Sequence, residues 1–184
     1  MSLVQAEEIH PSPEQVTLLK GQYQMQEGIR IVTGETDDTG HGPITYYHVP
    51  FKKGSFSTQW KHDQEQKNLF VIDAQKNGKA THLLKVYVNG MNKKVKAPNT
   101  LTIITYDGST KLKKKATIKK YSYHVEVGKW NSISIQIQDL EASIQINQDI
   151  FKVQSERFNE GVTKIGIGHF SDRLYTKNTF IQRD

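Results

Sequence analysis

The sequence predicts an all-β protein, an antiparallel β-sandwich of many short strands. Isoleucine occupies every second position in two runs, 133–137 and 144–146, which is the period-2 pattern of strands that are buried on one face. Asn-Gly or Asp-Gly pairs at 77–78, 89–90 and 107–108 follow β-branched and aromatic runs and indicate hairpin turns. No 11-residue window carries a convincing helical stripe. Short strands with regular turns are typical of a sandwich or barrel.

The first expected strands are set apart by turn-forming residues. Residues 28–32 (Gly-Ile-Arg-Ile-Val) alternate and stop at Thr33-Gly34, and residues 44–49 stop at Pro50, which has no backbone N–H for a sheet. Residues 35–43 form a polar, Gly-rich loop between them. Ahead of these strands, residues 13–20 carry the best helical pattern of the chain, enough for one or two turns.

The remaining strands follow in order and are closed by the three turn pairs or by polar breaks. The isoleucine runs form a hairpin around the break at residues 139–141, and a Gly-rich run stands near the end of the sequence. We expect these strands over residues 55–60, 68–74, 81–88, 101–106, 117–127, 132–138, 143–148, 164–170 and 179–182.

Length and composition indicate one domain. The 184 residues suffice for one all-β core, and no linker or repeat divides them, so we expect a loose segment over 1–16 and a single sandwich domain over 17–184. The chain has no cysteine, which excludes disulfides and cysteine-ligated metal. No stretch reaches the ~20 apolar residues of a membrane helix. We expect an extracellular or periplasmic protein, a mature chain whose residues 1–3 lack the apolar run of a signal peptide.

The isoleucine hairpin carries an uncharged polar face. Between the isoleucines stand Ser, Gln and Asn rather than Lys or Glu. Amides and hydroxyls can exchange hydrogen bonds with many sugar hydroxyls. We therefore expect a sugar-compatible sheet face, with Gln136 and Asn147 as candidate ligand-binding residues.

Several segments resemble the concanavalin A-like lectin/glucanase superfamily. They are the Gly-Lys-Trp-Asn opening at 128–131, the two alternating runs with their turn, and the Gly-rich run at 161–168. Within the superfamily the chain is most similar to the bacterial 3-keto-disaccharide hydrolase group and to laminin-G-like domains. The resemblance implies a jelly-roll sandwich and a carbohydrate partner. It implies a secreted sugar hydrolase of the keto-disaccharide or glycosidase type, a non-catalytic carbohydrate-binding module, or a laminin-G-like protein-interaction domain.

The enzymatic signatures of these groups are absent, so no catalytic residue can be assigned. The chain lacks the Ser-Gly-Ile/Val strand with a following Arg, the Glu-x-Asp-x-x-Glu signature of laminarinase-type enzymes and the Asp/Asn calcium loop of legume lectins. A glycosidase needs two carboxylates flanking one bond, and Asp63 with Glu65 is one candidate pair in a polar turn. Asp37 with Asp38 is another, which could instead hold a calcium-type cation; otherwise no cofactor or metal is expected.

Aromatic and imidazole side chains supply the other site candidates. Trp60 shares the parity of Phe56, which favours the core, but Lys61 and His62 follow it, so it is the best candidate for stacking on a sugar. His62 and His169 stand in or beside strands where they could flank a cleft, although a surface or partly buried ring is the alternative.

Basic residues concentrate in one predicted hairpin. The net charge is +6, and much of it comes from residues 111–120. A solvated hairpin edge is one interpretation, and contact with a sulfated or carboxylated glycan is the other. The aromatic-basic strand motif of RNA-binding proteins is absent, so no nucleic-acid partner is expected. The polyanion candidates are Lys111, Lys113, Lys114 and Lys115.

Overall fold

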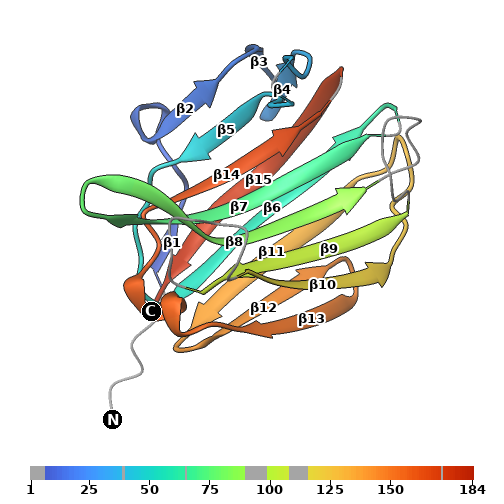
Figure 1. Cartoon of the computed structure of the whole chain (residues 1–184). Coiled ribbons are helices and arrows are strands. Elements are labelled where there is room, and N and C mark those ends of the chain that lie inside the picture. Colours follow the sequence, from blue (N-terminus) through green and yellow to red (C-terminus); the bar gives the residue numbers. More distant parts are fainter. Residues whose placement is uncertain (1–6, 39, 65, 90–98, 108–115, 171) are drawn as a thin grey trace.

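A computed structural model describes residues 7–38, 40–64, 66–89, 99–107, 116–170 and 172–184. Within them the chain forms two antiparallel sheets and two short 3-10 helices, η1 (Pro13–Gln15) and η2 (Glu156–Glu160). Figure 1 shows the sheets as two layers whose strands run in similar directions. The all-β sandwich predicted from the sequence is confirmed.

Sheet A contains the isoleucine hairpin and the C-terminal strand. Its strands follow the order β13-β12-β11-β6-β15-β4-β3, and β1 pairs with β15 beside this path. The bounds are β1 (Glu7–Ile9), β3 (Gln22–Gln26), β4 (Ile29–Thr33), β6 (Gly54–His62), β11 (Asn131–Gln138), β12 (Glu141–Ile146), β13 (Asp149–Gln154) and β15 (Arg173–Arg183).

Sheet B is the second layer and follows the order β10-β9-β8-β7-β14-β5-β2. Asn77 and Gly78 both adopt positive φ, at 51° and 73°, in the turn that joins β7 to β8, as the Asn-Gly signal predicts. The bounds are β2 (Val16–Leu19), β5 (Ile44–Tyr47), β7 (Lys67–Lys76), β8 (Lys79–Asn89), β9 (Thr100–Tyr106), β10 (Ala116–Ser122) and β14 (Lys164–His169).

The isoleucine hairpin has the predicted register. Ile133 pairs with Ile146 and Ile135 with Ile144 across β11 and β12, and these four side chains are buried between the sheets. The polar residues between them face outward, because a strand alternates its faces. Facing side chains of sheet B, among them Phe70, complete the core.

Several segments differ from the expected strands. β1, β2, β3 and β13 were not expected, and residues 13–20 form η1 followed by β2 rather than a longer helix. β10 is shorter than expected and β15 is longer. Residues 7–9 of the expected loose segment pair with β15. The division into one entry segment and one domain stays a prediction.

Ile135→Val tests the burial of the hairpin. Removing one methylene from a fully buried position should lower the free energy of unfolding by about 0.5–1.5 kcal/mol. Gln136→Thr, at the exposed neighbouring position of β11, should change it by less than about 0.5 kcal/mol. Urea unfolding of both variants measures the difference, and equal effects would mean that the two faces of β11 are wrongly assigned.

Candidate functional site

Three of the sequence-predicted ligand residues have almost completely buried side chains. The exposed fractions of Trp60, His62 and His169 are 0%, 1% and 1%. The Trp60 ring packs edge-on against Phe70, with 5.1 Å between the ring centroids, and His62 Nδ1 lies 3.2 Å from the side-chain amide nitrogen of Asn68. The Trp60 and His62 rings are too enclosed to stack on a sugar outside the sandwich. Trp60 lies on the same side of its strand as Phe56 and therefore points into the core, although Lys61 and His62 follow it in sequence.

His169 is uncharged in this environment. Burial lowers the pKa of its imidazole from 6.5 to about 4, because the interior disfavours the protonated ring. At physiological pH the ring is therefore neutral and adds no positive charge to its surroundings.

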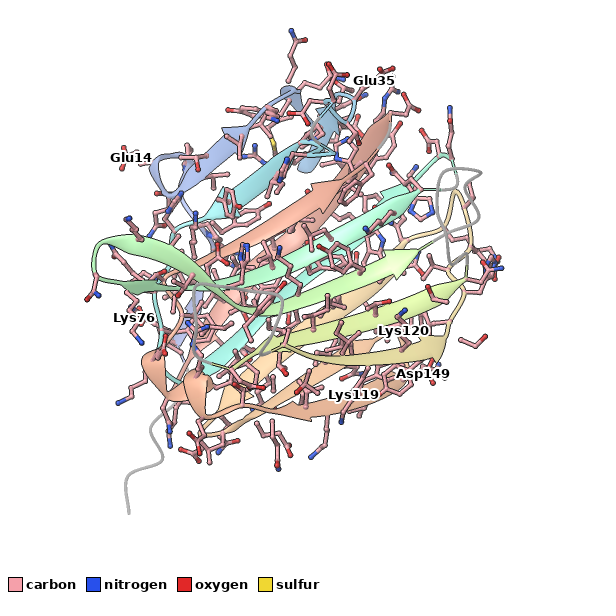
Figure 2. The ribbon with its side chains drawn as sticks, viewed as in Figure 1. Glu14, Glu35, Lys76, Lys119, Lys120 and Asp149 are labelled. Atoms are coloured by element: carbon pink, nitrogen blue, oxygen red, sulfur yellow. The ribbon has the colours of Figure 1, made fainter. Side chains whose placement is uncertain are left out.

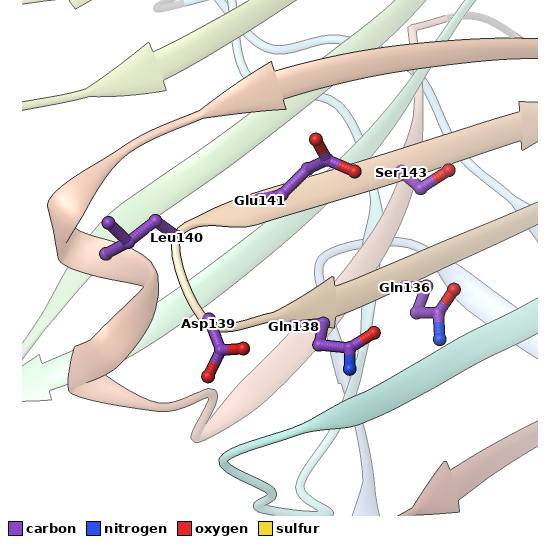
Figure 3. Close-up of a pocket in the computed structure, with 6 residues that line it drawn as sticks. All are labelled: Gln136, Gln138, Asp139, Leu140, Glu141 and Ser143. Atoms are coloured by element: carbon purple, nitrogen blue, oxygen red, sulfur yellow. The ribbon is translucent and has the colours of Figure 1, made fainter.

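The other two candidates lie on the outer face of sheet A but are not brought together. Gln136 lines a shallow hollow of about 380 Å³ at the turn between β11 and β12, and Figure 3 shows it beside Gln138 and Ser143. Asn147 lies in the turn at the other end of β12, with a φ of 53°. Its side chain accepts a hydrogen bond from the backbone N–H of Ser132 at 2.9 Å and thereby stabilises that turn.

A larger hollow lies on the outer face of sheet B, and the sequence analysis missed it. This sheet B groove has a volume of about 480 Å³, within the range of small-molecule sites. It is lined by Leu19, Lys20, Gly40, His41, Gly42, Ile44, Tyr46, Lys67, Leu69, Val71, His82, Lys85, Tyr87, Gly168, His169 and Phe170.

Two glycines of β14 lie at the groove floor, where Gly168 lines the groove and Gly166 is covered by neighbouring side chains. Gly166 pairs with Val71 of β7 on one side and Tyr46 of β5 on the other. A Cβ atom at Gly166 would lie 2.5 Å from Cγ1 of Val71, too close for any side chain. Since β14 contributes no side chain at this point, the apolar side chains of the neighbouring strands close over it.

Lysines and aromatic rings alternate along the groove. The Lys67 ammonium lies 4.1 Å from the centroid of the Tyr87 ring and 4.6 Å from that of Phe170. The Lys85 ammonium lies 5.8 Å from the ring of Tyr106, which borders the groove on β9. These are cation–π distances. The arrangement offers both flat apolar faces and positive charge to a ligand.

Asp73 anchors one end of the groove. Its carboxylate is only 2% exposed and lies 2.6 Å from Nδ1 of His82 and 3.8 Å from Nζ of Lys164. Because the carboxylate contacts Nδ1, it orients the His82 ring, whose side chain is about one-third exposed. The lining residues in the described part of the chain include no Asp or Glu, so the groove does not present the carboxylate pair of a glycosidase.

Arg157 of η2 stabilises the backbone that carries His82. Its guanidinium donates hydrogen bonds to the carbonyl of His82 at 3.0 Å, the hydroxyl of Thr81 at 2.9 Å and both carboxylate oxygens of Glu160 at 2.9 Å. It is 8% exposed, and the hydrogen bonds from Arg157 lower the pKa of Glu160. Apart from Phe158 the segment 156–160 is polar, so the sequence alone gave no signal for the role of Arg157.

Burial shifts the pKa of ionisable groups in the groove and beside it. It raises the pKa of both Tyr46 and Tyr106 to about 12, so their hydroxyls keep their protons and can donate hydrogen bonds. It lowers the pKa of Lys67 and, separately, that of Lys85. The ammonium form of each lysine is therefore less stable here than in water.

The carboxylate candidates form other contacts. Asp63 accepts a 2.6 Å hydrogen bond from the hydroxyl of Tyr175, whereas Glu65 lies outside the described residues. Asp37 forms an ion pair with Lys20 and accepts a 2.9 Å hydrogen bond from the backbone N–H of His41. In the part of the chain that the structure describes, no group of three His, Asp or Glu side chains is placed to hold a metal. Asp38 takes part in no such group.

The four lysines expected to contact a polyanion lie outside the described residues; these are Lys111, Lys113, Lys114 and Lys115. The neighbouring Lys119 and Lys120 lie on β10, as Figure 2 shows. No helix in the described ranges is long and apolar enough to cross a membrane.

Comparisons with known proteins support the fold. No family model matches the chain, and no curated protein matches its sequence. The carbohydrate-binding module CBM66 of Bacillus subtilis superimposes with a TM-score of 0.61 at 8% identity, over 90% of this chain and 93% of that one. The CBM2 module of the evolved Dit of Lactobacillus casei BL23 phage J-1 gives 0.69 at 12% identity, over 96% and 95%. Alginate lyase PA1167 of Pseudomonas aeruginosa gives 0.62 at 7%, over 89% and 86%.

The chain shares the jelly-roll sandwich fold. At such low identities the likeness extends to the arrangement of strands and not to the ligand of any neighbour. The narrower resemblance to 3-keto-disaccharide hydrolases and laminin-G-like domains stays a prediction.

Proposed function

We propose that this protein is a carbohydrate-binding β-sandwich that holds an oligosaccharide in the sheet B groove. The observation that carries the proposal is the set of aromatic rings in the groove, where Tyr46, Tyr87 and Phe170 line one hollow together with hydrogen-bonding side chains. Sugar rings have apolar faces and hydroxyl edges, and a binding site needs groups for both. The similar folds named as carbohydrate-binding modules and an alginate lyase give the proposal additional support.

Sugar hydrolysis is the second candidate function, and the Asp73–His82 pair favours it. An imidazole held by a buried carboxylate is suited to proton transfer. The described lining residues of the groove include no Asp or Glu, which favours binding without cleavage.

A laminin-G-like protein-interaction role would suit a flat basic surface better than this hollow. The proposed setting is extracellular or periplasmic.

Tyr87→Ala tests the location of the site. A glycan array identifies a bound oligosaccharide, and calorimetry with it should then show affinity weakened on the order of tenfold, because the ring forms one wall of the groove. Tyr23→Ala is the matched control, since Tyr23 is an exposed tyrosine on β3. Equal affinities of a folded Tyr87→Ala variant and the wild type would place the glycan elsewhere.

Incubation of the bound oligosaccharide with wild-type protein separates binding from hydrolysis. New reducing ends that appear with wild type and not with His82→Gln would establish hydrolysis through the Asp73–His82 pair. We expect none, as for a binding module.

A further inference from the structure

The charges of the sheet B groove do not balance. Its described lining residues include three lysines, Lys20, Lys67 and Lys85. Lys20 is paired with Asp37, and Lys164, beside the groove, is within ion-pair distance of Asp73, which also contacts His82. Among the described residues, no carboxylate lies within 4.0 Å of the ammonium group of Lys67 or Lys85. These two lysines therefore form a positive pair on adjacent strands that is only partly compensated, because the nearby charge of Asp73 raises the pKa of Lys85.

The positive pair is costly in the free protein. Burial lowers the pKa of both lysines, and the charge of Lys85 lowers that of Lys67 further. The rings of Tyr87 and Tyr106 offset part of this cost through cation–π contacts. A lysine that served only to cover an aromatic ring with its aliphatic stem would turn its ammonium group to water. Here both ammonium groups instead lie over aromatic rings in or beside the groove, Lys67 over Tyr87 and Lys85 over Tyr106.

An anion bound between the two lysines would relieve this cost. It would supply the missing counter-charge in a partly buried site, where electrostatic attraction is stronger than in water. The same groove presents hydroxyl groups of tyrosine and the exposed edge of His82, which suit a ligand rich in hydroxyls.

We propose that the ligand of the sheet B groove is an anionic glycan whose carboxylate or sulfate groups pair with Lys67 and Lys85. This inference rests on the proposed carbohydrate-binding function and specifies the class of sugar. Carboxylated and sulfated sugars share the required chemistry, a hydroxyl-bearing ring with a fixed negative charge.

The test compares four probes of equal length by calorimetry at low salt. They are an oligogalacturonate, a heparin oligosaccharide, a neutral cello-oligosaccharide and single-stranded oligothymidylate. We expect at least one of the two charged glycans to bind about tenfold or more tightly than the neutral one, and its affinity to fall as salt is raised. Binding of the oligogalacturonate would show that carboxylate groups suffice, whereas binding of heparin alone, which carries both carboxylate and sulfate groups, would indicate that sulfate is recognised.

Paired lysine variants connect this preference to the groove. Lys67→Gln combined with Lys85→Gln should weaken binding of the charged glycan by about tenfold or more. Lys76→Gln combined with Lys79→Gln is the matched control. These exposed lysines lie on the same two strands, and their substitution removes the same net charge. The control should bind like the wild type. Lys67→Arg with Lys85→Arg, which keeps the charge, should retain the preference even if the Gln variant folds poorly.

The outcomes separate the two proposals. A neutral glycan that binds as tightly as the charged ones overturns the anionic inference and leaves the carbohydrate site standing. No binding of any glycan overturns both. Tighter binding of oligothymidylate than of either charged glycan, or equal loss in the groove and control variants, also overturns the assignment of anionic glycans to Lys67 and Lys85.

Discussion

Replacing Trp60 with alanine is expected to lower the free energy of unfolding by about 3–5 kcal/mol. The ring is fully buried in the core and packs edge-on against Phe70 of the opposite sheet. Its removal leaves a cavity that the surrounding strands can fill only in part. Denaturant unfolding measures the loss.

Trp130 provides the matched control for this substitution. It is only partly buried, and the ammonium group of Lys177 lies 4.1 Å from its ring centroid. Trp130→Ala should therefore cost clearly less stability than Trp60→Ala. We also expect glycan affinity to be unchanged in Trp60→Ala under conditions where the variant is folded, because the ring does not line the groove. A stability loss below about 1 kcal/mol would contradict the core position of Trp60.

Replacing Arg157 with alanine is expected to cost about 1–3 kcal/mol, because it leaves buried acceptors of the guanidinium without their donor. The substitution leaves the carbonyl of His82 and the carboxylate of Glu160 without their donor. Thermal and denaturant unfolding measure the effect. Arg183→Ala is the matched control, because Arg183 pairs with Glu7 at the surface and its removal should cost no more than about 1 kcal/mol.

The pH dependence of the Arg157→Ala effect provides a second readout. Arg157 lowers the pKa of Glu160 in the folded state, so the pair stabilises the protein above the ordinary carboxylate pKa. That contribution is lost as the pH falls through the lowered pKa of Glu160. The difference in stability between wild type and variant should therefore shrink in acid. A difference that grows toward low pH would contradict the assigned ion pair.

The sequence was sufficient to predict the fold because its local patterns agree with the tertiary structure. The isoleucine hairpin shows its buried face directly, since the outer face of β11 is open to solvent. Segments with weak patterns were missed. β3 reads Gln-Tyr-Gln-Met-Gln and is exposed throughout, so its apolar residues mark no buried face.

The candidate site could not be found in the same way. Residues 68–74 of β7 are all buried, so buried and exposed positions do not alternate along the strand. The sequence therefore does not show on which face of the sheet Lys67 lies. The groove brings together residues from 19 to 170, and only the pairing of β5, β14, β7 and β8 places them side by side. Trp60 was a candidate because its polar neighbours follow it in sequence, whereas the sheet turns its own side chain inward.

The position of β15 has a consequence for how the chain folds. β15 lies between β6 and β4 and pairs with both, so residues 54–62 find one of their two neighbours only in residues 173–183. Loops on the order of a hundred residues must close before this pairing forms, which gives the protein a high contact order and a folding time in the range of milliseconds to seconds. During synthesis, β6 emerges from the ribosome long before β15 and exposes an unpaired edge in the interval. Such an edge invites pairing with other nascent chains, and a chaperone that shields extended segments would raise the yield of folded protein.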